Sequence, residues 1–222
     1  MSTILVIGAS RGIGFEFVRQ YRDVGRRVIA TARDVEGLQR LEELGAEPIR
    51  LDVTDPASVR GLAWQLEGEK IDIALYVAGV MSRGGAMQPP AQEEFDRTMR
   101  TNVWGAMQVI PQVAPLVEAA RGCFVFISSE MGYIGGVSSS YSWVYRASKA
   151  ALNMTVASAQ ADYPNATLVA MSPGWVKTDM GGGAAPLAVD RSVAAMRQTI
   201  EGLTRKHKGA FLNYDGRRFD GW

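Results

Sequence analysis

The stretch Ile4-Leu5-Val6-Ile7-Gly8-Ala9-Ser10-Arg11-Gly12-Ile13-Gly14 decides the fold. Its apolar run, residues 4–7, is typical of a strand buried on both faces of a parallel sheet, and apolar residues at helical spacing follow the glycines. Gly8 permits a sharp turn, Gly12 lets the backbone approach a pyrophosphate, and Gly14 allows a helix to pack closely on the strand. The pattern indicates a dinucleotide-binding turn, and a glycine-rich turn without a ligand is the alternative. The predicted binding residues of this turn are Gly8, Ser10, Arg11, Gly12, Ile13 and Gly14.

Strands and helices alternate along the rest of the chain. Apolar runs predict further strands at residues 26–31, 48–51, 71–77, 123–127, 167–171 and 209–213. This alternation predicts an α/β fold, a Rossmann-type doubly wound parallel sheet of seven strands with helices on both faces. No linker or repeat divides the sequence, so we expect residues 1–222 to form a single domain with a small substrate-side loop at about residues 176–190. Pro111 and Pro115 are expected to kink the long helix at residues 93–120 or to give it a stepped ending.

The end of the second predicted strand bears on the choice of dinucleotide. An acidic residue at this point holds the ribose 2′-hydroxyl of NAD, whereas an arginine accommodates the 2′-phosphate of NADP. Counting from the glycine turn, the acidic position falls on Ala32 and the next position on Arg33, while Arg11 is a second nearby arginine. NADP(H) is therefore favoured over NAD(H). A register shift of one residue would bring Asp34 to the ribose and reverse this preference.

Tyr145 and Lys149 stand four positions apart, on one face of a predicted helix. A nearby ammonium favours the phenolate form of tyrosine, so we expect Lys149 to lower the pKa of Tyr145 and to suit it to acid and base catalysis. Taken alone, the pair is more typical of an amphipathic helix with an exposed lysine. Ser128 and Ser129 end the strand at residues 123–127, at the edge where open α/β sheets bind ligands.

The composition argues against several other classes of protein. A net charge of +1 gives no support to a nucleic-acid or anionic-membrane partner. A single cysteine, Cys123, and a single histidine, His207, leave no cluster for a disulfide or a zinc site, so no metal is expected. We place His207 in a solvated turn. The N-terminal apolar run is too short for a signal peptide or a membrane span, and we expect a cytoplasmic protein.

Together these motifs resemble the short-chain dehydrogenase/reductase family over almost the whole chain. The matching residues are Gly8, Gly12 and Gly14, Asp52-Val53, Ala78-Gly79, Asn102 with Gly105, Ser129, Tyr145 with Lys149, and Pro173-Gly174 with Thr178. The sequences around Tyr145 and Thr178, and the ending from Phe211 to Gly216, are most similar to the branch of carbonyl reductases that includes Sniffer and C-factor.

The resemblance implies a role for each matching residue. Tyr145 would be the acid/base at the carbonyl oxygen, Lys149 would lower its pKa and bind the nicotinamide ribose, and Ser129 would hydrogen-bond the substrate oxygen. Asn102 would anchor a water that links Lys149 to bulk solvent. The remaining residues would bind the cofactor, namely Asp52 and Val53 the adenine, Ala78 and Gly79 the adenosine side, and Pro173, Gly174, Val176 and Thr178 the nicotinamide end.

Three features depart from the family pattern. Ile7 stands where most members have threonine, and Tyr76-Val77 replace a pair of asparagines. Both changes affect polar groups that connect the central strands. The separation of Ser129 from Tyr145 is also longer than is common, which leaves Ser128 as a rival for the role of catalytic serine, with Ser129 preferred.

The resemblance implies an NADP(H)-dependent oxidoreductase that acts on a small-molecule carbonyl or alcohol. The alternative is a cofactor-binding regulatory or signalling protein of the same fold with little catalysis. Family members usually pair through the helices that hold Asn102 and Tyr145, which implies a homodimer or homotetramer. The sequence identifies neither the substrate nor the role of the C-terminal tail.

Overall fold

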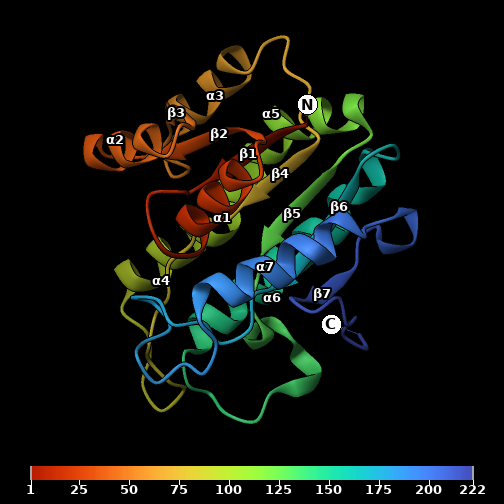
Figure 1. Cartoon of the computed structure of the whole chain (residues 1–222). Coiled ribbons are helices and arrows are strands. Elements are labelled where there is room, and N and C mark those ends of the chain that lie inside the picture. The colour runs from red at the N-terminus through yellow and green to blue at the C-terminus, as the bar shows by residue number, and fades with distance from the viewer. Residues whose placement is uncertain (1, 222) are drawn as a thin grey trace.

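Strand β1 (Thr3–Ile7) is wholly buried and lies in the middle of a seven-stranded sheet (Figure 1). The computed structural model describes residues 2–221. The strand order is β3-β2-β1-β4-β5-β6-β7, and every neighbouring pair is parallel. The other strands are β2 (Arg27–Ala32), β3 (Glu47–Arg50), β4 (Ile73–Tyr76), β5 (Cys123–Ile127), β6 (Thr167–Ser172) and β7 (Phe211–Asn213). The predicted doubly wound parallel sheet is confirmed, with strand ends shifted by at most about two residues.

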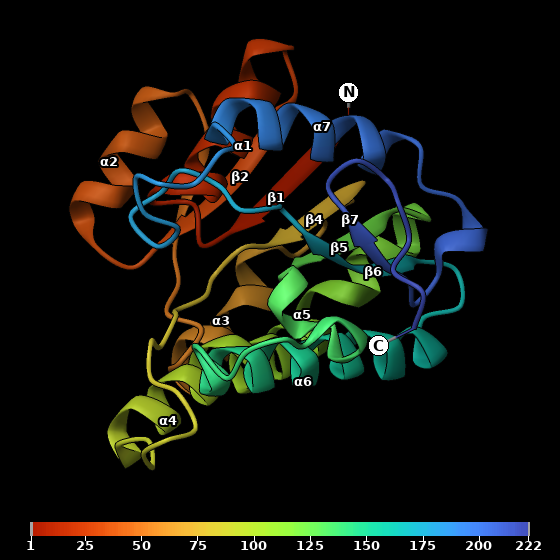
Figure 2. The same ribbon diagram turned by 90° about the horizontal axis from the view of Figure 1, so that it is seen from below.

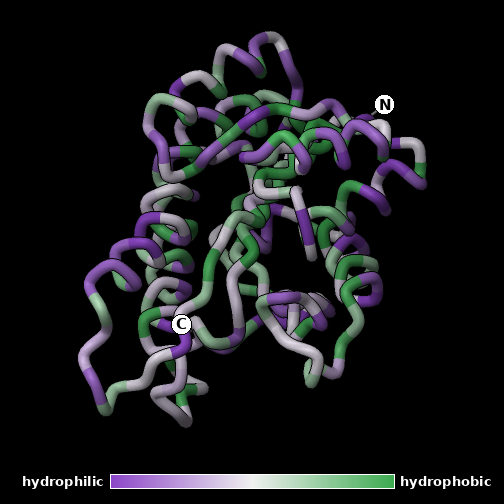
Figure 3. The backbone as a smooth tube through the Cα atoms, turned by 90° about the vertical axis from the view of Figure 1, so that its left-hand side faces the viewer, coloured by the Kyte–Doolittle hydropathy of each residue, from purple (hydrophilic) through white to green (hydrophobic). Residues whose placement is uncertain are grey.

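Helices cover both faces of the sheet, and Figure 2 shows the two layers that they form. Phe17, Leu41 and Met196 belong to the core on one face, whereas Leu62, Val113 and Leu152 belong to the core on the other. Hydrophobic positions are concentrated in the central strands (Figure 3). The helices of the first face are α1 (Gly12–Asp23), α2 (Val35–Glu43) and α7 (Val189–Glu201), and those of the second are α3 (Pro56–Gln65), α5 (Gly105–Ala120) and α6 (Trp143–Ala159).

The helix predicted at residues 93–120 is divided in a way that the sequence did not indicate. It consists of α4 (Gln92–Met99), a π-helical turn (Arg100–Trp104) and α5. Pro111 and Pro115 both lie inside α5, which continues to Ala120, so the predicted stepped ending is wrong. The irregular turn contains Asn102. Single π-helical turns inside α-helices frequently occur at functional sites.

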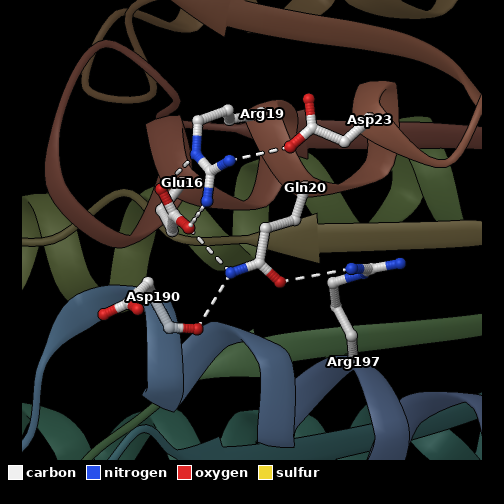
Figure 4. A network of polar contacts seen from close by, with 6 residues as sticks. All are labelled: Glu16, Arg19, Gln20, Asp23, Asp190 and Arg197. Atoms are coloured by element: carbon white, nitrogen blue, oxygen red, sulfur yellow. Dashed lines mark hydrogen bonds and ion pairs between the residues drawn. The ribbon is translucent and has the colours of Figure 1, made fainter.

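Gln20 of α1 connects this helix with α7 on the same face of the sheet (Figure 4). Its side-chain nitrogen donates to Glu16 Oε1 at 2.7 Å and to the carbonyl of Asp190 at 2.9 Å. Its oxygen accepts a hydrogen bond from Arg197 at 3.2 Å. Since α7 follows the loop predicted on the substrate side, this network attaches one end of that loop to the helix that begins at the glycine turn. The network also includes Arg19 and Asp23, which form an ion pair on α1.

Candidate active site and cofactor cleft

A cleft at the carboxyl ends of the central strands brings most of the predicted site residues together. This is the edge of an open α/β sheet at which ligands bind. The predicted residues that line the cleft are Gly8, Ser10, Arg11, Gly12, Ile13, Arg33, Asp52, Val53, Ala78, Gly79, Tyr145, Lys149, Pro173 and Thr178. The predicted residues outside its lining are Gly14, Asn102, Ser129, Gly174 and Val176.

The turn between β1 and α1 has the geometry of a phosphate-binding turn. Gly8 has φ +86°, and a β-carbon there would lie 2.6 Å from the amide nitrogen of Ala78. A β-carbon on Gly14 would lie 2.3 Å from the Gly8 carbonyl oxygen, so only glycine allows α1 to pack so closely on the strand. The N-cap residue Arg11 makes no side-chain capping bond, and no acidic side chain lies in the first turn of α1. The first amides of α1 are therefore free to bind an anion.

The end of β2 presents an arginine to the cleft rather than an acid. β2 ends at Ala32, and both Ala32 and Arg33 line the cleft. Asp34 instead caps α2, where its carboxylate accepts a hydrogen bond from the Gly37 amide at 2.7 Å. The register that would bring Asp34 to a ribose is therefore not the one that the structure adopts.

Asp52 lines the cleft beyond the end of β3. Burial acts to raise the pKa of this carboxyl, but hydrogen bonds from the Thr54 amide at 2.8 Å and the Thr54 hydroxyl at 2.7 Å outweigh it, so the pKa is lowered. The carboxylate is thus charged and fixed in orientation, which suits it to accept a hydrogen bond from a ligand in the cleft.

Tyr145 and Lys149 lie side by side in the first two turns of α6, where both are buried. Their side chains are 7% and 3% exposed, and Lys149 Nζ lies 5.6 Å from the centre of the Tyr145 ring. The ammonium donates a hydrogen bond of 2.8 Å to the carbonyl of Ile127 at the end of β5. The alternative of an exposed lysine on an amphipathic helix is therefore wrong.

The expected lowering of the Tyr145 pKa is not observed. Burial raises the pKa of Tyr145 to about 12, with hydrogen bonding by the Ser129 side chain acting in the opposite direction. Burial also lowers the pKa of Lys149 to about 8. In both groups desolvation disfavours the charged form. Tyr145 is consequently a protonated phenol at neutral pH, ready to donate a proton.

The two adjacent serines have different surroundings. Ser128 lines the cleft but is only 2% exposed, and its hydroxyl donates a hydrogen bond of 2.6 Å to the buried Asn153 Oδ1. The Ser129 side chain lies near enough to Tyr145 to act to lower its pKa, and it caps the short helix Glu130–Gly132 by accepting a bond from the Met131 amide at 3.1 Å. Ser129 is therefore the serine beside the tyrosine, whereas the Ser128 hydroxyl is held by Asn153.

Asn102 projects from the π-helical turn and is completely buried. Its amide nitrogen donates to the Val80 carbonyl at 2.8 Å and to Ser148 Oγ at 2.9 Å, and its oxygen accepts from the Val80 amide at 2.8 Å. A β-carbon on Gly79 would lie 3.3 Å from Asn102 Oδ1 and 3.5 Å from Lys149 Nζ. Asn102 thus fixes the segment after β4 against α6, next to Lys149.

Several residues of the cleft were not predicted. Thr31 accepts a hydrogen bond from the Gly8 amide at 3.0 Å, and so supplies a hydroxyl beside the glycine turn, where Ile7 has none. Asp179 and Met180 also line the cleft, and Asp179 forms an ion pair with Arg11 at 3.5 Å. Of these residues, Thr31 could have been predicted from the sequence, because its hydroxyl lies at the end of a predicted strand.

The substrate-side loop is folded back on itself. Its base is closed by a hydrogen bond of 2.8 Å from the Lys177 amide to the Leu187 carbonyl. The Trp175 indole donates to the Gly181 carbonyl at 2.9 Å. Gly181 packs directly against the backbone of Val176, where a β-carbon would clash. The glycine-rich segment is therefore held in a defined arrangement beside the cleft.

Residues 2–221 contain no helix that is both long and apolar enough to span a membrane. The same residues contain no group of three or more His, Cys, Asp or Glu side chains that could hold a metal ion. His207, which was predicted in a solvated turn, is partly buried and accepts a hydrogen bond of 3.0 Å from the Thr204 amide at the start of a short helix.

The fold and the cleft together define a dinucleotide-binding α/β protein with a tyrosine and a lysine at its ligand edge. A family model described as short chain dehydrogenase matches residues 2–187. The chain therefore belongs to the short-chain dehydrogenase/reductase family of oxidoreductases, as its motifs predicted.

Individual relatives agree with the predicted branch of this family. The chain is 34% identical to C-signal of Myxococcus xanthus over 149 residues, which cover 66% of this chain and 90% of that protein. The carbonyl reductase Sniffer of D. melanogaster superimposes with a TM-score of 0.92 at 29% identity, with both chains covered completely. A short-chain dehydrogenase/reductase of Burkholderia multivorans, solved with bound NADP, gives a TM-score of 0.89 at 31% identity and covers 100% of this chain and 99% of that one.

Proposed function

We propose that this protein is an NADP(H)-dependent oxidoreductase that transfers a hydride between the cofactor and a small carbonyl or alcohol substrate. The proposal rests on the proximity of three side chains, those of Ser129, Tyr145 and Lys149. Ser129, just after β5, lies near enough to Tyr145 of α6 to act to lower its pKa, and Lys149 lies one turn further along that helix with its ammonium on the Ile127 carbonyl. A hydroxyl pair beside a buried cation is an arrangement suited to proton transfer at a carbonyl oxygen.

The residues of the cleft fit a nicotinamide dinucleotide. The uncapped N-terminus of α1 suits a pyrophosphate, and Asp52 and Val53 would hold the adenine. Ala78 and Gly79 would lie on the adenosine side. Lys149, Pro173, Gly174, Val176 and Thr178 would hold the nicotinamide end.

NADP(H) is the preferred cofactor in this proposal. Arg33 lines the cleft, whereas Asp34 is occupied as the cap of α2. Arg11 lines the same cleft and supplies a second positive charge. A relative of known structure contains NADP. Two arginines without a free acid at the end of β2 favour a ligand with a 2′-phosphate.

A bound nicotinamide would supply or accept the hydride, and the side chains of the chain handle the proton. The neutral phenol of Tyr145 donates its proton to the carbonyl oxygen during reduction, because its raised pKa keeps it protonated at neutral pH. Ser129 donates a hydrogen bond to the same oxygen and stabilises the negative charge that develops there. Lys149 stabilises the phenolate that remains, and in this proposal Asn102 anchors a water that leads a replacement proton to Lys149.

A second candidate function follows from one relative. C-signal of Myxococcus xanthus bears the name of a signal rather than of an enzyme. On this reading, the chain binds a dinucleotide and acts through a partner, with little catalysis.

Cofactor titration followed by a carbonyl screen separates the two functions. NADPH and NADH are titrated separately by fluorescence, and para-nitrobenzaldehyde and a panel of ketones and quinones are then tested with the cofactor that binds. Turnover that depends on NADPH supports the oxidoreductase. Tight binding of NADPH without turnover of any carbonyl would favour the signalling protein.

The chain is also proposed to form a homodimer or homotetramer through α4, α5 and α6. The outer surfaces of these helices expose apolar side chains, with Phe95 43%, Met107 49% and Met154 61% exposed. Burial of such side chains favours association. Light scattering on the purified protein, compared with a Met154→Lys variant, tests this assembly, and an unchanged mass in the variant would count against this interface.

A further inference from the structure

The C-terminal segment after β7, residues 214–220, turns back along the edge of the sheet. The turn is formed at Gly216, which has φ +85°, and Asn213 donates a backbone hydrogen bond of 2.8 Å to Arg217. The Phe219 amide then donates to the Phe211 carbonyl at 3.1 Å. The segment thus covers the outer edge of β7 and brings Phe219 onto the sheet.

Phe219 joins the sheet to the segment that follows Ser129. Its ring stacks on Phe211, with centroids 4.2 Å apart, and packs against Tyr133, with centroids 5.3 Å apart. The Tyr133 hydroxyl donates a hydrogen bond of 3.4 Å to the carbonyl of Asp220. Both Phe219 and Asp220 therefore contact Tyr133, Phe219 through the ring and Asp220 through the hydroxyl.

Tyr133 is connected to Ser129 by a single hydrogen-bonded turn. The Gly132 amide donates to the Ser129 carbonyl, and the Tyr133 amide donates to the Glu130 carbonyl, both at 2.9 Å. A β-carbon on Gly132 would lie 2.9 Å from the backbone of Lys149, so the turn is pressed against α6. Because the turn is short and closed, a displacement of Tyr133 moves the Ser129 hydroxyl relative to the helix that holds Tyr145.

The same C-terminal segment also contacts the opposite side of the site. The Tyr214 ring lies against Gly174, where a β-carbon would be 2.9 Å from it. Ser172 Oγ links the two sides, because it accepts hydrogen bonds from the Glu130 amide at 3.0 Å and from the Gly174 amide at 3.3 Å. Residues 214–220 thus contact both Tyr133, in the turn after Ser129, and Gly174, which follows β6.

We propose that residues 214–220 are a positioning element of the active site, in which Phe219 acts through Tyr133 to fix the Ser129 hydroxyl opposite Tyr145. This inference rests on the proposed catalytic function of Ser129 and assigns a role to a segment that makes no contact with the reacting atoms. Displacing a hydrogen-bond donor from the developing charge lowers the rate, and cofactor binding should change little because neither Phe219 nor Tyr133 lines the cleft.

The test compares the purified full-length protein with Phe219→Ala, Phe219→Leu and Tyr133→Phe. With NADPH and para-nitrobenzaldehyde, Phe219→Ala should lower kcat about tenfold while the Kd for NADPH changes by less than about twofold. Phe219→Leu should restore most of the rate, because leucine refills the space between Phe211 and Tyr133. Tyr133→Phe should give a smaller loss, since the ring contact remains.

A destabilised variant at a distance provides the control. Val59→Ala creates a cavity in α3, in a residue that is 1% exposed and outside the site. The proposal is overturned if Phe219→Ala retains its kcat, or if its loss of kcat is no larger than that of Val59→Ala at an equal loss in Tm.

Hydrogen exchange gives a readout that does not depend on turnover. In Phe219→Ala, the amides from Glu130 to Tyr133 should exchange faster than in the unmodified protein, while those of α3 are unchanged. If the unmodified protein reduces no carbonyl, the proposed function fails, and the positioning role is then decided by exchange alone. Unchanged exchange in that turn overturns it.

Discussion

The hydroxyl of Tyr76 donates a hydrogen bond of 2.9 Å to the backbone carbonyl of Thr101, inside the protein. Tyr76 ends β4 at a position where the family usually has asparagine, and Thr101 lies in the π-helical turn, next to Asn102. Gly105 makes room for the phenol, because a β-carbon there would lie 2.7 Å from its oxygen. Burial raises the pKa of Tyr76 well above its ordinary value, so the hydroxyl remains a donor. Tyr76 thus joins β4 to the π-helical turn through a buried hydrogen bond.

Removing this hydroxyl should destabilise the protein. Tyr76→Phe keeps the ring contact with Phe126 but leaves the Thr101 carbonyl without its donor, at a cost of about 1–2 kcal/mol in the free energy of unfolding. Urea unfolding measures the change, with Tyr163→Phe at a partly buried position as the matched control. A Tyr76→Phe variant as stable as the control would show that the hydrogen bond contributes nothing.

The two serines should respond differently to loss of the hydroxyl. Ser129→Ala should lower kcat about 10²–10³-fold, because its hydroxyl is proposed to stabilise the developing charge, and should cost only about 1 kcal/mol of stability through loss of its cap on Glu130–Gly132. Ser128→Ala should leave kcat nearly unchanged but cost about 1–3 kcal/mol, because Asn153 loses its buried partner. Steady-state kinetics and urea unfolding on both variants decide between the two serines. The reverse pattern would make Ser128 the catalytic serine.

Arg33 should determine the preference between the two cofactors. Arg33→Ala should raise the Kd for NADPH about tenfold and the Kd for NADH less than about twofold, since only NADPH carries the 2′-phosphate. Fluorescence titration with each cofactor measures both constants. Asp34→Ala is the matched control, and should cost about 1 kcal/mol of stability through loss of the α2 cap without changing the cofactor ratio. An equal loss of both cofactors in Arg33→Ala would contradict the assignment.

The buried ammonium of Lys149 should make stability depend on pH. Its pKa is lowered to about 8 in the folded protein from an ordinary value of 10.5. Between these values the unfolded chain binds more protons, so the Lys149 contribution to stability is most unfavourable below about pH 8 and improves as the pH rises. Relative to the unmodified protein, Lys149→Met should therefore be more stable near neutral pH, by an amount that falls by on the order of 2 kcal/mol towards about pH 10.

Urea unfolding at several pH values checks this expectation. Lys70→Met, at an exposed position, is the control and should show no such trend. The lost hydrogen bond to Ile127 reduces the gain in Lys149→Met at every pH, so the slope rather than the size of the difference is diagnostic. A difference that does not change with pH would show that Lys149 titrates normally.

The sheet and most of the cleft were predictable from the sequence, because each depends on local pattern. Apolar runs marked all the strands, and the glycine turn identified the edge at which the ligand binds. The π-helical turn was not predictable, because no local pattern in residues 93–120 marks it and its partner Tyr76 lies on another element. The raised pKa of Tyr145 was missed because the spacing to Lys149 indicates proximity of the two groups but not the burial of the phenol.

The role of the C-terminal segment also could not be predicted from the sequence. Its contact with Tyr133 joins residues that are 87 positions apart, and neither residue belongs to a family motif. Only the arrangement of β7 beside the Ser129 turn reveals that the two lie together.

Tyr145 is proposed to donate the proton to the substrate carbonyl, and the Tyr145→Phe variant tests this role. The variant keeps the ring on α6 and removes only the hydroxyl. NADPH consumption with para-nitrobenzaldehyde should fall about 10²–10⁴-fold, while the Kd for NADPH, measured by fluorescence on the same preparation, should change by less than about twofold. A Tyr145→Phe variant that binds NADPH and reduces the aldehyde at the rate of the unmodified protein would show that Tyr145 is not the proton donor.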